Sequence, residues 1–283
     1  MRIEPAFAGH GIWFRRTDVT DCDNLIAASW DNVVDTQLNT KIANADGASV
    51  STVEHLMAAL AGCGVHNVLV NIDGPEVPIF DGSALRFVKE ILAAGVQPQA
   101  EPITELQILL PVRVSRDDAF AELVPADSFR MDYRIEFDQS AIGEQSLEGD
   151  FSNGAFLREL ADCRTFCRKS DIDALREKGL ALGGTYENAI VVDGAHILSP
   201  GGFRRADECV RHKMLDAVGD LALAGAPIVG LYRGHKAGHA LTNQLLRKLF
   251  ATPGAFRMVH AEGNIDQRLP GFGLTRHDVA VSI

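Results

Sequence analysis

The segment 207–227 constrains this chain most, because it predicts a helix that carries charged groups in one line along an apolar segment. At 3.6 residues per turn, His212, Asp216 and Asp220 fall one turn apart in a single column. Gly225 marks the end of the helix. The same segment supplies an apolar face from Val210, Met214, Ala217, Val218 and Leu221.

Two interpretations of this column are open from the segment alone. A neutral histidine and a carboxylate four residues apart can bind one metal ion, so His212 and Asp216 would form half of a zinc site that needs a third ligand. The alternative is a solvated helix face, a polar stripe that also includes Glu208 and Lys213. A histidine near an aspartate on a helix is common, so the column alone favours the polar stripe.

Composition limits the class of protein. The chain has 283 residues, of which 46% are hydrophobic and 23% charged, as in an ordinary globular protein. A net charge of -11 argues against nucleic acid as the main partner but allows a phosphorylated substrate. The five cysteines include no C-x-x-C pair, which indicates a reducing cytoplasm. We expect a cytoplasmic protein without an integral membrane segment, since Asp220 interrupts the longest apolar run.

The order of expected elements predicts an α+β fold in two parts, residues 1–100 and 101–283, joined near a proline-containing linker at 96–102. In each part strands come first and helices follow, which suggests two similar layers of sheet and helices related by duplication. The first part is expected to contain strands at 11–14, 24–29, 33–42 and 65–72, and helices from 51 and at 83–94. The second is expected to contain strands at 106–115, 119–124, 129–137 and 189–192, and helices at 154–160, 172–178 and 238–250.

The segment 51–55 offers the missing ligand. Ser51 and Glu54 fit a capping box at the start of a helix, which would explain both residues by local structure alone. A glutamate followed directly by His55 can equally deliver a catalytic carboxylate and a metal ligand together. The H-E-x-x-H motif is absent, so His55 would have to join His212 and Asp216 from the other part of the chain. Three protein ligands leave a position for water, as in catalytic zinc sites.

Further motifs occur along nearly the whole chain. They are Ser-Thr-Val-Glu-His-Leu at 51–56, Ala-Ala-Leu-Ala-Gly at 58–62, Asp-Gly-Pro-Glu-Val-Pro-Ile at 73–79, Asp-Gly-Ser-Ala at 81–84, Arg-Thr-Phe at 164–166, Leu-Gly-Gly at 182–184, the segment 203–225, and Lys-Ala-Gly-His-Ala-Leu at 236–241. Together and in this order they resemble the UDP-3-O-acyl-N-acetylglucosamine deacetylases.

The resemblance implies zinc-dependent hydrolysis of the acetamide on a UDP-linked, 3-O-acylated glucosamine, the committed step of lipid A synthesis. It implies one catalytic Zn²⁺ held by His55, His212 and Asp216, with Glu54 as the general base. The resemblance also implies that His239 is a second essential histidine, that Asp220 is the carboxylate that holds it, and that Thr165 is the oxyanion donor. It further implies that Lys213 is the active-site cation, that Phe166 lies beside the acyl passage, and that Lys236 contacts the diphosphate.

The resemblance also implies an architecture. The active site is expected between the two parts, each carrying a small insert, and the insert around 167–198 is expected to supply an apolar groove for the acyl chain. We expect a monomer. Family members begin further upstream, so the start at Met1 predicts a truncated first strand. Two alternatives stay open: a zinc amidohydrolase that acts on another N-acetyl sugar, and a truncated non-catalytic homologue.

Overall fold

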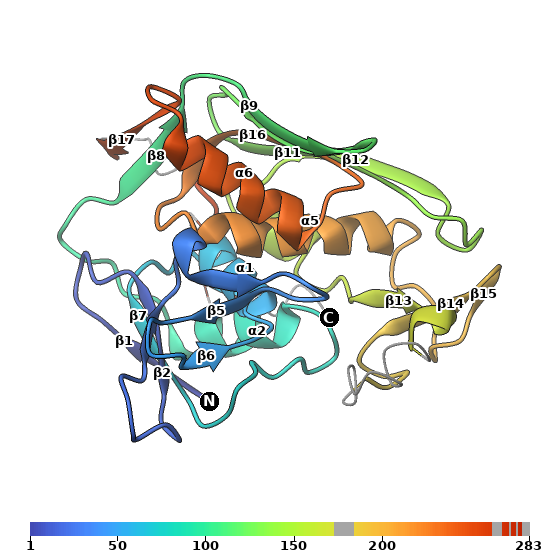
Figure 1. Ribbon diagram of the computed structural model, residues 1–283, viewed down its shortest axis with the longest axis horizontal. Coiled ribbons are helices and arrows are strands. Elements are labelled where there is room, and N and C mark those ends of the chain that lie inside the picture. Colours follow the sequence, from blue (N-terminus) through green and yellow to red (C-terminus); the bar gives the residue numbers. More distant parts are fainter. Residues whose placement is uncertain (173–183, 262–267, 272, 276, 279–283) are drawn as a thin grey trace.

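The computed structural model describes residues 1–172, 184–261, 268–271, 273–275 and 277–278. It confirms a mixed α+β architecture, with four sheets and several helices in the described residues. Helices lie between a smaller sheet built from the first third of the chain and a large sheet built from strands between residues 104 and 260 (Figure 1).

The first sheet has four strands in the order β1-β7-β2-β3. These strands are β1 (Arg2–Pro5), β2 (Ile12–Arg16), β3 (Leu25–Ala27) and β7 (Val68–Ile72). The pair β2 and β7 is parallel, whereas β1 with β7 and β2 with β3 are antiparallel. Two helices follow in this part of the chain, α1 (Glu54–Gly62) and α2 (Leu85–Ala94).

The expected strand at 33–42 is wrong. The short 3-10 helix η1 (Trp30–Asn32) leads into β4 (Val33–Asp35), and β5 (Lys41–Ala43) then pairs back antiparallel to it and to β6 (Ser49–Val50). Asp35 accepts a hydrogen bond from the backbone N–H of Gln37, and Leu38 has a positive φ of 72°. The backbone therefore turns at 36–40, where the sequence shows no glycine or proline.

The large sheet has seven strands, with β12-β11-β16-β10-β9 along its main path. The strands are β8 (Thr104–Ile108), β9 (Val112–Arg116), β10 (Ala119–Val124), β11 (Phe129–Glu136), β12 (Glu144–Asp150), β16 (Ile228–His235) and β17 (Phe256–His260). The late strand β16 runs parallel to both β11 and β8 and lies between β11 and β10. Strand β16 was not predicted from the sequence, although it pairs with β8, β10 and β11 and so connects the sheet.

The expected single strand at 106–115 is divided by Pro111 into β8 and β9. Proline has no N–H to donate and fixes φ, so a strand seldom continues through it. The backbone N–H groups of Leu109 and Leu110 instead both donate to the carbonyl of Ala255. As a result β8 pairs with β16 and β17, whereas β9 pairs with β10.

The remaining elements belong to the second part of the chain. They are α3 (Ala155–Glu159), the three-stranded sheet of β13 (Phe166–Arg168), β14 (Ile190–Asp193) and β15 (His196–Ile197), and the helices α5 (Glu208–Ala222) and α6 (His239–Ala251). The small sheet stands apart from the large one (Figure 1). It falls in the expected insert at 167–198. Most of the expected helix at 172–178 and of the Leu-Gly-Gly motif lies outside the described residues.

Helices α1 and α5 pack directly against each other at the centre of the molecule (Figure 1). A Cβ atom at Gly219 of α5 would lie 1.9 Å from the backbone oxygen of Glu54 and 3.0 Å from its Cα atom, so only glycine allows this approach. Nearly every residue of α1 is buried. The start of α1 is thereby fixed against the middle of α5.

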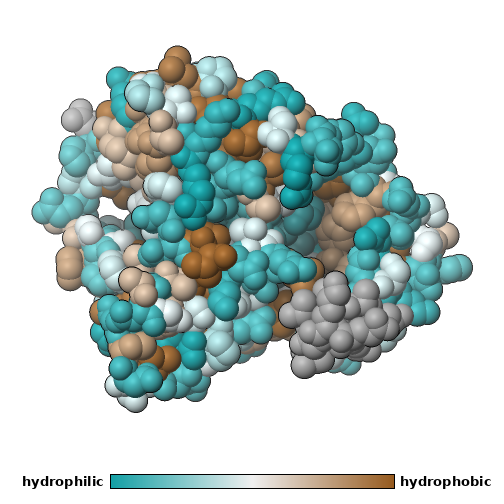
Figure 2. All heavy atoms as spheres, in the orientation of Figure 1, coloured by the Kyte–Doolittle hydropathy of each residue, from teal (hydrophilic) through white to brown (hydrophobic). Residues whose placement is uncertain are grey.

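The outer surface in Figure 2 is mostly hydrophilic, with small apolar patches scattered over it. Within the described ranges, no helix combines the length and the apolar character needed to cross a membrane. The two longest described helices, α5 and α6, carry charged residues and pack against the large sheet.

Candidate metal centre and active site

Glu54 and His55 are the first two residues of α1, where the segment after β6 turns into the helix. The capping-box interpretation is wrong, because α1 begins at Glu54 and has no side-chain cap. Ser51 uses its backbone to hydrogen-bond with the segment at 75–77. The Glu54 carboxylate accepts a hydrogen bond from the backbone N–H of Thr40, 3.0 Å from Oε2. Its side chain is therefore held by the segment that precedes β5 rather than by its own helix.

His55, His212 and Asp216 converge as the spacing and the resemblance predicted. The Nε2 atoms of His55 and His212 lie 3.5 Å and 3.2 Å from the same oxygen, Oδ1 of Asp216. One ligand atom from each residue lies within 4.8 Å of the other two. The imidazole rings are nearly perpendicular, at 85°, with centroids 5.1 Å apart. This is a buried triangle of two nitrogens and one oxygen.

The supporting contacts leave the triangle free to bind a cation. The Nδ1–H of His212 donates to the carbonyl of Cys163 at 3.0 Å, which directs Nε2 into the triangle. Lys213 Nζ donates to Asp216 Oδ2 at 2.7 Å and so holds the carboxylate oxygen that faces away from it. Burial by itself would raise the pKa of Asp216, but the adjacent His212 and Lys213 hold that pKa well below its usual range.

His55 supplies a direct test of whether a metal fits. Burial lowers the pKa of His55, which favours the neutral imidazole that a metal requires. Its Nδ1 is buried without a hydrogen-bond partner among the described residues. Among the described residues, the polar contact of this ring is that of Nε2 with Asp216 inside the triangle, which suits a metal ligand. Two imidazoles and a carboxylate are typical of zinc, and they leave one position open.

The solvated-stripe alternative for the α5 column is wrong. His212, Asp216 and Asp220 are 2%, 5% and 3% exposed, and Glu208 is fully buried. The Glu208 carboxylate pairs with Arg164 and also accepts the backbone N–H groups of Arg164 and Arg204. Buried charges need such partners, so each carboxylate of the column has a defined one.

Asp220 and His239 form a second pair beside the triangle. His239 is the first residue of α6, and its Nδ1–H donates to Asp220 Oδ2 at 2.8 Å. Burial by itself would lower the pKa of His239, but the attraction of Asp220, with a further contribution from Glu54, raises it to about 9. The imidazole is therefore a cation at neutral pH. The predicted pairing of these two residues is present in the structure.

Glu54 carries the proton affinity expected of a general base. Burial raises its pKa to about 7, against the attraction of the His239 cation, which lowers it. A carboxylate with a pKa near neutrality can both take and return a proton at physiological pH. The charges of His239, Asp220 and Asp216 all act on this carboxylate.

Thr165 and Phe166 border the site on the side of the small sheet. The backbone of Thr165 pairs with Gly82 and Ile190, and its hydroxyl has no hydrogen bond within the described part of the chain. The ring of Phe166 lies edge-on to His212, with centroids 6.3 Å apart. The structure thus places Phe166 next to the metal ligand His212, with Thr165 directly before it in the chain, without assigning their roles.

The surroundings of Lys236 differ from those expected of a residue that binds a diphosphate. Its Nζ lies 2.7 Å from both Asp118 Oδ2 and Glu136 Oε2, so two carboxylates already neutralise this cation. These pairs raise the pKa of Lys236. A contact with a diphosphate would require the lysine to leave at least one of them.

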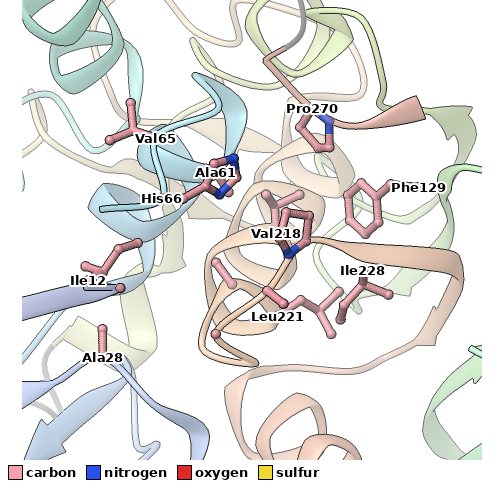
Figure 3. A pocket seen from close by; sticks show the side chains of 15 residues that line it. Ile12, Ala28, Ala61, Val65, His66, Phe129, Val218, Leu221, Ile228 and Pro270 are labelled. Carbon is pink, nitrogen blue, oxygen red and sulfur yellow. The ribbon is translucent and has the colours of Figure 1, made fainter. Parts of the chain in front are cut away.

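An apolar pocket of about 80 Å³ lies elsewhere, at the C-terminal ends of α1 and α5 (Figure 3). Its walls include Ala61, His66, Val218 and Phe129, and none of the predicted site residues lines it. Burial lowers the pKa of His66 to about 4, so its ring is neutral there. The pocket is separate from the metal centre and from the small sheet.

Thr40 contacts two of the predicted catalytic residues, although it was not among the residues predicted from the sequence. No spacing could reveal it, because Thr40 lies 14 residues from Glu54 and 180 from Asp220. The expected continuous strand at 33–42 also hid the turn that brings it into the site.

Two imidazoles and one carboxylate that could hold a metal ion, buried beside a glutamate of raised pKa in an α+β fold, are an arrangement typical of metal-dependent hydrolases. The sequence profile described as UDP-3-O-acyl N-acetylglycosamine deacetylase (LpxC) matches residues 1–251. The chain belongs to this family.

Individual relatives agree with this assignment. The UDP-3-O-acyl-N-acetylglucosamine deacetylase of Phenylobacterium zucineum is 51% identical over 258 residues, which cover 91% of this chain and 88% of the relative. Those of Myxococcus xanthus and Idiomarina loihiensis are 46% and 45% identical, over 97% and 92% of this chain and 86% and 85% of theirs.

Proposed function

We propose that the chain is a zinc enzyme that hydrolyses the acetamide of UDP-3-O-acyl-N-acetylglucosamine, giving the free amine and acetate in the committed step of lipid A synthesis. The observation that carries this proposal is the convergence of His55 from α1 with His212 and Asp216 from α5 on one buried point. Family membership supplies the substrate, and the geometry supplies the reaction centre.

When bound, zinc lowers the pKa of water and polarises the acetyl carbonyl. The residues around it then divide the proton transfers. Glu54, with a pKa of about 7, takes the proton of the attacking water. The free hydroxyl of Thr165 is the neutral donor toward the developing oxyanion, and the His239 cation adds positive field. Amide nitrogen needs a proton before it can leave, and Glu54 or His239 delivers it.

Lys213 forms its hydrogen bond with the metal ligand Asp216. Its ammonium is bound to Oδ2, and the surrounding carboxylates raise its pKa although burial lowers it. We infer that Lys213 fixes the orientation of Asp216 and adds positive charge near the oxyanion. This combines the expected role as an active-site cation with a structural one.

The remaining expectations extend this proposal to the substrate. We infer two related layers, residues 1–100 and 101–283, with the site between them and with the small sheet as part of the acyl-binding insert at 167–198. Phe166, edge-on to His212, would contact the start of the acyl chain. Lys236 would bind the diphosphate after release from Asp118 or Glu136. We expect a cytoplasmic monomer.

A single set of assays tests the function. The zinc-loaded protein is incubated with UDP-3-O-acyl-N-acetylglucosamine, with the same sugar lacking the acyl chain, and with free N-acetylglucosamine, and acetate release is measured. Rapid release only from the acylated UDP-sugar is expected. Equal rates on simpler sugars would favour a different N-acetyl sugar as substrate, and no release from any of them would indicate a non-catalytic homologue.

A further inference from the structure

We propose that Thr40 is a positioning residue for the reaction, because it holds the general base and the carboxylate of the histidine pair in one fixed arrangement. This inference rests on the proposed function. It concerns a residue that binds no metal and that lies outside the motifs by which the sequence identifies the site.

Thr40 joins Glu54 to Asp220 through two different groups. Its backbone N–H donates to Glu54 Oε2 at 3.0 Å, and its hydroxyl donates to Asp220 Oδ1 at 2.6 Å. Both bonds end on carboxylates, which makes them stronger than neutral hydrogen bonds. Glu54 begins α1, whereas Asp220 lies near the end of α5, so Thr40 connects the two helices from a third segment.

Thr40 is itself held rigidly. It is 1% exposed, and its carbonyl accepts the backbone N–H of Val53, the residue just before α1, at 3.2 Å. It directly precedes β5, whose pairing with β4 and β6 anchors the chain on that side. A donor fixed by backbone bonds loses little entropy when it binds a carboxylate.

These bonds determine which carboxylate oxygens remain for catalysis. With Oδ1 of Asp220 bound to Thr40, Oδ2 is directed at His239. With Oε2 of Glu54 bound to the Thr40 N–H, Oε1 has no hydrogen bond from the described residues and is available to the reacting water. The Thr40 hydroxyl is the part of this arrangement that a substitution can remove, since the backbone N–H stays.

Two variants separate the hydroxyl from the shape of the side chain. Thr40→Val keeps the branched side chain and the backbone N–H but loses the donor to Asp220, whereas Thr40→Ser keeps the donor and loses a methyl group. We expect kcat of the zinc-loaded Thr40→Val enzyme to fall by about 10- to 100-fold, the effect of removing a supporting hydrogen bond at a site. We expect Thr40→Ser to stay close to wild type, with KM and zinc content unchanged in both.

A titration of the His239 ring by NMR in the zinc-loaded proteins adds a readout independent of turnover. Asp220, Glu54 and Lys213 are the charged groups that act on this ring. Removal of the hydroxyl leaves the full charge of Asp220 to His239, so its titration is expected at higher pH in Thr40→Val than in wild type and Thr40→Ser.

Three results would overturn the proposal: a wild-type kcat in Thr40→Val, equal losses in Thr40→Ser and Thr40→Val, or a His239 titration in Thr40→Val that stays in place or moves down. If the wild-type enzyme itself released no acetate, the proposed function would fail. The NMR titration would still decide whether the Thr40 hydroxyl controls Asp220 and His239.

Discussion

His239 Nδ1 lies 2.8 Å from Asp220 Oδ2, although His239 occupies the first position of α6. The positive end of a helix dipole disfavours an imidazolium at that position. The carboxylate outweighs both this effect and burial, since the pKa of His239 is raised to about 9. The pair therefore keeps a proton next to Glu54 throughout the neutral range.

The first prediction concerns Asp220→Asn. Loss of the carboxylate charge should bring the pKa of His239 down from about 9, so the alkaline limb of the kcat profile should move to lower pH. The measurement is kcat against pH for the zinc-loaded variant and wild type. Zinc content serves as the control, because Asp220 is not among the ligands. An alkaline limb unchanged by the substitution would contradict the assignment of that limb to His239.

The same pair predicts how stability depends on pH. The pKa of His239 is raised from an ordinary 6.5 to about 9, so the stabilisation is complete below about 6.5 and is lost as pH rises through about 9. The free energy of unfolding of wild type relative to Asp220→Asn should therefore decrease over this interval. Urea denaturation at several pH values measures it, and a difference that grows with pH would be the wrong sign.

Glu54→Gln tests the general base. The amide keeps the size of the side chain but cannot take a proton, so kcat should fall by about 10²- to 10⁴-fold. Zinc content should be retained, since the three ligands are unchanged. Metal analysis and single-turnover rates check both parts. A variant that keeps its zinc and turns over at the wild-type rate would remove Glu54 from the chemistry.

Gly219→Ala tests the contact between α1 and α5. The new Cβ would lie 1.9 Å from the Glu54 backbone oxygen, so α1 must move away, with an expected loss of about 1–3 kcal/mol in unfolding free energy. His55 moves with α1, so zinc affinity should fall as well. Gly62→Ala is the matched control, because its Cβ would meet the ring of Phe156, from 2.0 Å, at the other end of α1. If both variants bound zinc equally well, Gly219 would have no special role in the site.

The sequence predicted more of the candidate site than of the fold. His212, Asp216 and Asp220 are close through helix geometry alone, so their spacing was informative. Their burial was not, because it results from packing of α1 and the large sheet against α5. The Glu54-His55 pair made the convergence of His55 with them a hypothesis, and the resemblance supported it. No local spacing could establish it, since α1 and α5 are far apart in the chain.

The errors in the predicted strands have physical causes of two kinds. Pro111 was a visible signal for the end of β8 that the apolar pattern of 106–115 outweighed. The turn before Thr40 has no such signal, because Leu38 adopts a positive φ of 72° that its residue type does not favour. Strand β16 depends on parallel pairing with β8 and β11, which no local pattern encodes.

The central claim is that His55, His212 and Asp216 hold the catalytic metal. X-ray absorption at the zinc edge of the loaded protein, with His212→Ala and His66→Ala beside it, tests this claim most directly. We expect two imidazole nitrogens and only N/O ligands at about 2.0–2.2 Å in wild type and His66→Ala, and loss of the bound zinc in His212→Ala. Sulfur at about 2.3 Å in wild type, or a full complement of zinc in His212→Ala, would contradict it.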